Sequence, residues 1–325
     1  MGDIALEEKV ESKITTSIEE MLQQDIDSAV EFDEFPENRK VPNIYRGRAL
    51  NNVELYQMTA RRETQLVLVA GLFHSGKTTM EMAFYQMFLR GDNKRLQFSG
   101  SQTLVDVVER SKGLRVTSGN AVPAMVRTSN AEPDNYLHLE IMDQEQKRHN
   151  LIFTDFAGEV FDYDSTVEAD IFLERFVGIK HVMILVDGEK LAGQMKNQAL
   201  IDCKKVLSRL IQKRIISDET TVHVIYSKSD MILNSKNPNI EEIINRNNDK
   251  MRKILGNRKG KILIHRIAAI SQDTTKIKNY EGLEELLESC LDNLDVRWEN
   301  IDESNGIYSD KAVAKNSFDK FAWKG

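Results

Sequence analysis

The residues best suited to chemistry form the segment Gly71–Thr78, with the sequence Gly-Leu-Phe-His-Ser-Gly-Lys-Thr. The segment matches the pattern G-x-x-x-x-G-K-[ST], and it lies between an apolar run and a helical pattern. Its glycines, Gly71 and Gly76, let the backbone curl so that several N–H groups converge on phosphate oxygens. The start of the following helix adds the positive end of its dipole. The segment therefore predicts binding of a nucleoside triphosphate.

Single side chains of this segment have separate expected roles. Lys77 supplies a positive charge between the outer phosphates, and the Thr78 hydroxyl is placed to bind Mg²⁺. Ser75 and Thr79 are further candidate nucleotide contacts. Two interpretations of His74 stay open: it contacts the γ-phosphate, or it is a loop side chain that faces solvent or a partner.

A second segment, residues 150–159, reads Asn-Leu-Ile-Phe-Thr-Asp-Phe-Ala-Gly-Glu, as expected for a strand that ends in a turn. Such a strand delivers Asp155 beside the phosphate loop, where its carboxylate can hold Mg²⁺ through water. Gly158 can approach the γ-phosphate and donate its backbone N–H. The alternative is an ordinary strand-end aspartate with a turn glycine, and the phosphate loop upstream favours the nucleotide interpretation.

A third segment, Ser227-Lys228-Ser229-Asp230, follows another apolar strand pattern. The carboxylate of Asp230 can accept two hydrogen bonds from guanine N1 and N2, which adenine cannot offer. The aliphatic stem of Lys228 can lie over the base. These residues, with Ser227, predict guanine recognition, and the alternative is a Ser/Asp cluster that caps a helix.

Alternating apolar runs and helical patterns must position these segments. Strand patterns occur at residues 65–71, 136–142, 150–155, 181–187, 221–227 and 261–268. Helical patterns occur at residues 77–90, 166–178, 194–214, 240–255 and 281–294. Strands that alternate with helices indicate an α/β fold, here a mostly parallel six-stranded sheet with helices on both faces.

Three regions are expected along the chain: an acidic amphipathic helix and linker at 1–43, the α/β domain at 44–295 and a polar tail at 296–325. The domain contains a long connection at 91–135 with a helix of its own near 102–111, and connections of that length are usually functional. The N-terminal helix packs on its own domain or docks on a partner. Its apolar stripe consists of Ile4, Val10, Ile14, Ile18, Met21, Ile26 and Val30.

Composition narrows the function classes. Residues 1–40 hold 12 acidic and 4 basic residues, while the other 285 hold 39 and 40, so the net charge of −7 belongs to the N-terminal arm. Neither part resembles a nucleic-acid groove, and no apolar run reaches the roughly 18 residues of a membrane span. Cys203 and Cys290 lie too far apart for a paired-cysteine zinc signature. We therefore expect a cytoplasmic protein with no direct membrane or nucleic-acid signal.

The histidines outside the phosphate loop show no metal-ligand spacing either. We expect most of them to be core or sheet-face residues in strands. They are His138, His149, His181, His223 and His265.

The ordered set of three segments resembles the translation-factor-related (TRAFAC) class of P-loop GTPases, over about residues 62–295. In that class the segments are called G1, G3 and G4, and a fifth element contacts guanine O6 through the backbone. The fifth element would fall near residues 268–271, at Ala269, in a sequence that departs from the usual Ser-Ala-Lys. The class also implies a threonine that closes over Mg²⁺ and the γ-phosphate. Thr128 is the candidate and Thr117 the alternative.

A closer resemblance is to the bacterial double-GTPase families of conflict and anti-phage systems. It rests on the longer segments Phe98–Leu104, Arg127–Ser129, Thr154–Phe161 and Val186–Leu191. The resemblance implies a GTPase that works beside other proteins of a defence-type system, with a second GTPase or a second copy of itself as possible partners.

GTP hydrolysis needs positioning and charge stabilisation more than covalent chemistry. Lys77 and Gly158 would stabilise charge on the phosphates, and segments 113–130 and 156–166 would act as switches. Glu159 replaces the glutamine that orients water in Ras-like GTPases, and Phe73 can obstruct an incoming arginine. We therefore expect slow intrinsic hydrolysis of GTP to GDP with Mg²⁺, accelerated by a partner. The alternatives are a nucleotide-binding assembly subunit with negligible hydrolysis, or an ATPase.

Overall fold

The computed structural model describes residues 47–91, 93–114, 135–162, 167–256, 261–272 and 274–291. Helices and strands follow one another along the chain in an alternating order. They are α2 (Asn52–Thr59), β1 (Thr64–Ala70), α3 (Lys77–Arg90), β2 (Gln97–Gly100), α4 (Leu104–Arg110), η1 (Ser111–Leu114), β3 (Tyr136–Met142), β4 (Arg148–Thr154), η3 (Gly158–Phe161), α5 (Val167–Glu174), β5 (His181–Val186), α6 (Gly188–Ala192), α7 (Lys196–Gln212), β6 (Thr221–Tyr226), α8 (Ser229–Leu233), α9 (Ile240–Leu255), β7 (Ile262–Arg266) and α10 (Leu283–Glu288).

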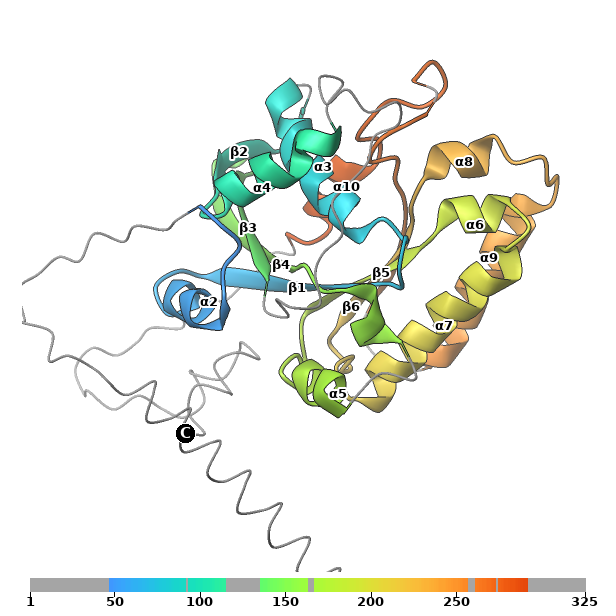
Figure 1. The fold of residues 1–325 in the computed structure, drawn as a ribbon, viewed down its shortest axis with the longest axis horizontal. Helices are drawn as coiled ribbons and strands as arrows, with labels where there is room; N and C mark the ends of the chain where they lie inside the picture. The colour runs from blue at the N-terminus through green and yellow to red at the C-terminus, as the bar shows by residue number, and fades with distance from the viewer. Residues whose placement is uncertain are drawn as a thin grey trace, which may run out of the picture. The chain divides into compact units, whose positions relative to one another are not determined.

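The described strands form one seven-stranded sheet in the order β2-β3-β4-β1-β5-β6-β7 (Figure 1). The strands from β4 to β7 pair in parallel, while β3 is antiparallel to both β4 and β2. The expected α/β fold with a mostly parallel sheet is therefore confirmed. The expected count of six strands is one short, because the four-residue edge strand β2 is too short to give a strand pattern of its own.

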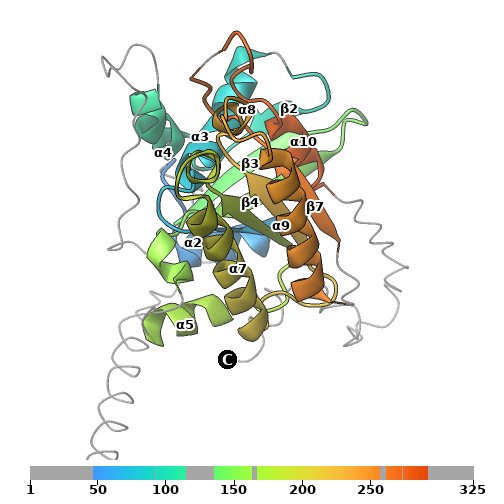
Figure 2. The ribbon, with the colours of Figure 1, turned by 90° about the vertical axis from the view of Figure 1, so that its right-hand side faces the viewer.

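Helices cover both faces of the sheet, as doubly buried parallel strands require. The apolar side chains of α2, α5, α7 and α9 share one buried cluster with one face of the strands. Those of α3, α4 and α10 share a second cluster with the other face. Figures 1 and 2 show α7 and α9 side by side across the first of these faces. Every residue of β5 and β6 is buried.

Local sequence explains where several elements begin and end. Asn51 caps α2 by accepting a hydrogen bond from the Glu54 amide at 2.9 Å, and the Glu54 carboxylate accepts one from the Asn51 amide at 3.0 Å. Helix α3 ends at Gly91, whose φ of 72° places it in the left-handed region favoured by glycine. The sequence analysis missed α2, α6 and α8, which have eight, five and five residues and are too short for a clear helical period.

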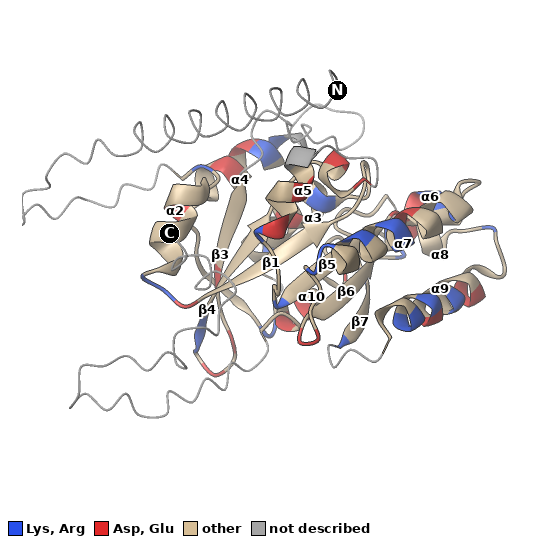
Figure 3. Ribbon diagram, turned by 90° about the horizontal axis from the view of Figure 1, so that it is seen from below, with Lys and Arg blue, Asp and Glu red and all other residues tan. Residues whose placement is uncertain are grey.

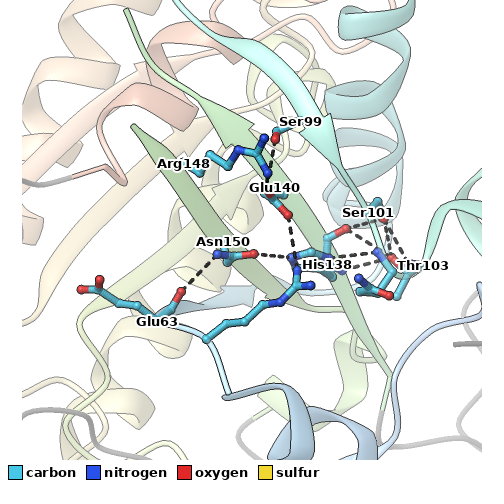
Figure 4. A network of polar contacts seen from close by, with 10 residues as sticks. Glu63, Ser99, Ser101, Thr103, His138, Glu140, Arg148 and Asn150 are labelled. Carbon is cyan, nitrogen blue, oxygen red and sulfur yellow. Dashed lines mark hydrogen bonds and ion pairs between the residues drawn. The ribbon is translucent and has the colours of Figure 1, made fainter. Parts of the chain in front are cut away.

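A network of polar contacts joins β2, β3 and β4 to the turn before α4 (Figure 4). The amide of Gln102 donates to Nδ1 of His138 at 2.9 Å, so the ring proton lies on Nε2, which donates to Asn150 at 3.1 Å. Ser101 donates to the carbonyl of His138 at 2.6 Å. Because Thr103, the residue before α4, also accepts from the His138 amide at 3.0 Å, the network anchors the start of that helix to the sheet.

Charged residues of both signs lie along the outer helices, most visibly on α7 and α9, while β1, β5 and β6 carry none (Figure 3). Among the described residues, no helix is both long enough and apolar enough to cross a membrane. The N-terminal helix at 1–43 and the tail at 296–325 lie outside the described residues, so the expected division into three regions stays a prediction.

Two buried histidines, His138 and His223, and the half-buried His265 predict acid-sensitive folding. Burial lowers the pKa of His138 and of His265 to about 4, and that of His223 well below its ordinary 6.5. Well above pH 6.5 these rings are neutral in both the folded and the unfolded protein. As the pH falls through 6.5, only the unfolded chain takes up protons at them. We expect the unfolding free energy, measured in the presence of a chelator, to decrease as the pH is lowered from about 7 to about 5. Each group contributes up to about 1.4 kcal/mol per pH unit.

Denaturant titrations over that range measure the effect. A His138→Gln variant that still folds should show a smaller slope than the wild type, since it lacks one of the three groups. Equal unfolding free energies at both ends of the range would contradict the prediction.

Candidate nucleotide-binding site

The phosphate loop connects the carboxyl end of β1 to the start of α3. Helix α3 begins at Lys77, and the residue before it, Gly76, has φ 93° in the left-handed region. His74 also adopts a left-handed conformation, with φ 65°. A Cβ built on Gly71 would lie 2.6 Å from Oγ of Ser75, so the loop can close in this form only with glycine at that position.

Lys77 is buried inside this loop. Its Nζ donates to the carbonyl of Gly71 at 2.8 Å, which points the charge at the concave side of the loop. Burial lowers the pKa of Lys77, and the nearby carboxylates of Glu81, Asp155 and Glu159 act against that shift. An anion bound in the loop would replace water as the partner of this ammonium group.

Asp155 lies beside the loop at the end of β4 and is completely buried. The Thr78 hydroxyl donates to its Oδ1 at 3.2 Å, so the two predicted metal ligands are in contact. Its Oδ2 forms an ion pair with Arg110, the last residue of α4. Arg110 also pairs with Asp106 at 2.7 Å. Thus α4 supplies a cation directly to the predicted metal ligand.

Glu81 is a second residue of the site that the sequence analysis missed. It lies one turn after Lys77 on α3 and is only 1% exposed. Burial and the neighbouring Asp155 raise the pKa of Glu81 well above its ordinary value. Nothing in the local pattern marked Glu81 or Arg110, because an acid or an arginine on a helix usually faces solvent. A charged residue among the apolar positions of α3 was the only available signal for Glu81.

Gly158 passes directly under the phosphate loop. A Cβ built on it would lie 2.6 Å from the backbone N of Phe73 and 2.8 Å from the carbonyl carbon of Leu72. The turn after β4 and the phosphate loop are therefore in backbone contact. Glu159, the next residue, is exposed.

The third segment meets the phosphate loop from the other side. Oγ of Ser227 donates to the carbonyl of Ser75 at 2.8 Å, which links the two segments directly. Asp230 is buried, and its Oδ2 accepts a hydrogen bond from the amide of Gln272 at 3.0 Å. Its Oδ1 is buried with no hydrogen-bond partner. An orphaned carboxylate oxygen of this kind is expected where a ligand supplies the donor.

Two acids of the segment that follows β5 hold the ammonium group of Lys228. Its Nζ lies 3.1 Å from Oδ1 of Asp187 and 2.8 Å from Oε2 of Glu189. Gly188 between them packs so closely that an added Cβ would lie 2.0 Å from the carbonyl of Ser227. The segment after β5 therefore positions the third segment, a role that only the tertiary structure reveals.

The remaining residues of the predicted site differ in their exposure, and some lie outside the described residues. Phe73 and His74 are exposed at the tip of the loop, with ring centroids 3.8 Å apart. Ala269 is half-buried after β7, and Thr79 is half-buried in the first turn of α3. Thr128, its alternative Thr117 and most of the segment 113–130 lie outside the described residues, as do residues 163–166 of the second switch segment.

The sequence profile of the family described as Double-GTPase 2 matches residues 65–291, which is more than half of the chain and includes all three segments. The chain belongs to the Double-GTPase 2 family. Membership supports guanine-nucleotide binding by this chain, and it confirms the resemblance to a double-GTPase family.

Among curated proteins, none matches the double-GTPase chain. A similar solved structure is a crystal structure of a mutation variant of SsGBP, with 12% sequence identity and a TM-score of 0.38. The match covers 73% of this chain and 58% of the SsGBP chain. This chain therefore spans less than two thirds of the length of the SsGBP chain.

The contact at Gly158 predicts a steric cost for any side chain there. Gly158→Ala should lower the unfolding free energy of the double-GTPase by about 1–3 kcal/mol, because its Cβ meets backbone rather than a flexible side chain. Gly100→Ala is the matched control, since the nearest atom to its Cβ is Oε2 of Glu140 at 3.7 Å. Denaturant unfolding of both variants measures the difference, and equal stabilities would refute the close approach.

Proposed function

We propose that this protein binds GTP and hydrolyses it to GDP with Mg²⁺, and that it acts as a conformational switch in a multi-protein bacterial defence-type system. The observation that carries the proposal is the contact between the phosphate loop and the segment proposed to recognise guanine. Ser227 donates to the phosphate loop at Ser75, while Asp230, three residues on, keeps one buried carboxylate oxygen without a partner.

Recognition of guanine is assigned to Asp230. Its Oδ1 would accept from the guanine N1–H or the 2-amino group, and adenine carries neither donor in that arrangement. The stem of Lys228 would lie over the base, because Asp187 and Glu189 hold its ammonium group in place. The backbone near Ala269 would contact guanine O6.

The residues beside the phosphate loop fit Mg²⁺. A hydroxyl and a carboxylate, Thr78 and Asp155, already lie in contact, and both offer the oxygen ligands that this ion prefers. Thr128 is the proposed third ligand. When bound, the ion neutralises charge that develops on the phosphate oxygens. Arg110 pairs with Asp155 in this structure, so α4 would have to share or release that carboxylate.

The chain's own groups would do the rest of the catalytic work. Lys77 and the loop amides, with the proposed contacts of His74, Ser75 and Thr79, would hold the phosphates. The backbone N–H of Gly158 would donate to the γ-phosphate, and Glu159 would orient the attacking water. Glu159 adds negative charge at that place, and its charge is felt at Lys77. Slow intrinsic turnover is therefore expected.

The proposed setting is the cytoplasm, beside other proteins of the same system. The family name supports partners of the same kind: a second GTPase or a second copy of this chain. Phe73, 45% exposed at the tip of the phosphate loop, is where such a partner would meet the nucleotide site.

A second candidate function is a nucleotide-binding assembly subunit with negligible hydrolysis. The exposed Phe73 and the acidic Glu159 favour it, since neither residue type supplies the usual help to an attacking water. An ATPase is the third candidate, and the buried acceptor of Asp230 opposes it.

Phosphate release distinguishes the three candidates. We expect Mg²⁺-dependent release from GTP in excess of release from ATP. We expect Lys77→Ala to reduce it by about 100-fold or more, since the mutation removes the main cation at the phosphates. A colorimetric phosphate assay on both proteins measures it. Equal release from GTP and ATP would favour the ATPase, and GTP binding with no release would favour the assembly subunit.

Base selectivity tests Asp230 directly. Asp230→Asn should weaken GTP binding by about 10- to 100-fold, the cost of losing a charge-assisted hydrogen bond. The variant should also gain relative affinity for xanthosine triphosphate, whose base carries an oxygen in place of the guanine amino group. Asp218→Asn, at an exposed position, is the matched control. An Asp230→Asn variant with unchanged nucleotide preference would sink the guanine assignment.

A further inference from the structure

Three histidines lie on the adjacent parallel strands β5, β6 and β7. His181 is the first residue of β5, His223 is the third of β6 and His265 is the fourth of β7. His181 alternates along β5 with Met183 and Leu185, which pack in the cluster beneath α3 and α10. The histidines therefore occupy this face of the sheet, where apolar residues are the rule.

Short polar contacts connect the rings. His181 Nδ1 lies 3.0 Å from His223 Nε2, and His223 Nδ1 lies 3.3 Å from His265 Nε2. The outer nitrogen of His181 lies 2.6 Å from the side-chain amide of Gln65, and Oγ of Ser289 lies 3.3 Å from Nδ1 of His223. Each of the two buried rings thus has a polar partner on the nitrogen that faces away from the other.

Cys290 brings a thiol to the same place from the segment after α10. It is fully buried, and its Sγ and one ring nitrogen from each of His181 and His223 all lie within 4.8 Å of one another. In a tetrahedral zinc site with bonds of about 2.0–2.3 Å, neighbouring ligand atoms are separated by roughly 3.3–3.7 Å. The three atoms therefore need shifts of the order of 1 Å or less to reach zinc-binding positions.

The chemistry of these groups suits a transition metal. Two imidazoles and a thiolate form a nitrogen and sulfur donor set that zinc prefers over oxygen donors. Both imidazole rings and the thiol are buried, so the site excludes the bulk water that would compete for the ion. Gln65 and Ser289 lie on the outer nitrogens, where ligand histidines usually have a hydrogen-bond partner that orients them.

We propose that His181, His223 and Cys290 bind a zinc ion, with water in the fourth position. The ion would link β5 and β6 to the segment that follows α10. It would therefore hold that segment against the sheet. This site is independent of the proposed GTPase activity. Its histidine ligands lie on β5 and β6, whereas Asp155 follows β4, which β1 separates from β5 in the sheet.

Cobalt substitution in full-length protein stripped with a chelator tests the proposal. One Co²⁺ per chain should give intense tetrahedral absorption bands and a near-ultraviolet thiolate-to-cobalt band, and Zn²⁺ should displace it. A Mg²⁺ site built from oxygen donors cannot give the thiolate band. Competition with a chromogenic chelator should yield one tight zinc per chain and a higher melting temperature for the zinc-loaded protein.

Variants assign the ligands. Cys290→Ser or Cys290→Ala should abolish the thiolate band, and His223→Gln should lower zinc affinity by about 100-fold or more, because each removes a direct ligand. Cys203→Ser and His265→Gln are the matched controls. Cys203 is equally buried but lies on α7, and His265 contacts the cluster without belonging to it. Both controls should keep the band and the zinc.

Two results would overturn the proposal. Wild-type protein that takes up no stoichiometric zinc at micromolar concentration would mean that the rings only hydrogen-bond to one another. A cobalt spectrum unchanged in Cys290→Ala, or lost equally in Cys203→Ser, would place the metal elsewhere. Because zinc uptake by the wild type is measured directly, the proposal can fail even where a variant does not fold.

Discussion

The buried carboxylate of Asp155 is the constraint on which the nucleotide end of this structure depends. A carboxylate removed from water needs an opposite charge and hydrogen-bond donors, or folding becomes costly. Arg110 and Thr78 supply these, and they come from α4 and α3. Three elements from distant parts of the chain are therefore held at one point, and the polar network around His138 fixes the start of α4 from behind.

The sheet carries two chemically different groups of polar side chains. At the carboxyl ends of β1, β4 and β6, three turns bring backbone amides, Lys77, Asp155 and Asp230 together. Close backbone contacts at Gly158 and Gly188 lock these turns against each other, so each segment is shaped by its neighbours. On β5 and β6, the imidazoles of His181 and His223 meet the thiol of Cys290. The first arrangement suits a phosphate anion with a hard cation, and the second suits a softer metal.

The three segments of the candidate nucleotide site could be recognised in the sequence because each of them is local. A glycine-rich loop with lysine and threonine, a strand-end aspartate and a Ser-Lys-Ser-Asp turn carry their chemistry in a few consecutive residues. The α/β fold followed from the alternation of apolar runs and helical periods. The sequence did not predict short elements such as β2 and α8, because four or five residues do not establish a period.

What the sequence by itself determined, then, is the fold class and the three segments of the site. Only the tertiary structure decided that Arg110 pairs with Asp155, that Glu81 is buried beside it and that Gly188 supports Ser227. It also brought His181 and His223 to Cys290, across separations of 42 to 109 residues that no motif spacing could reveal. The physical reason is the same in each case. These contacts arise from strand order and helix packing, which bring together residues whose local sequence shows no sign of a shared role.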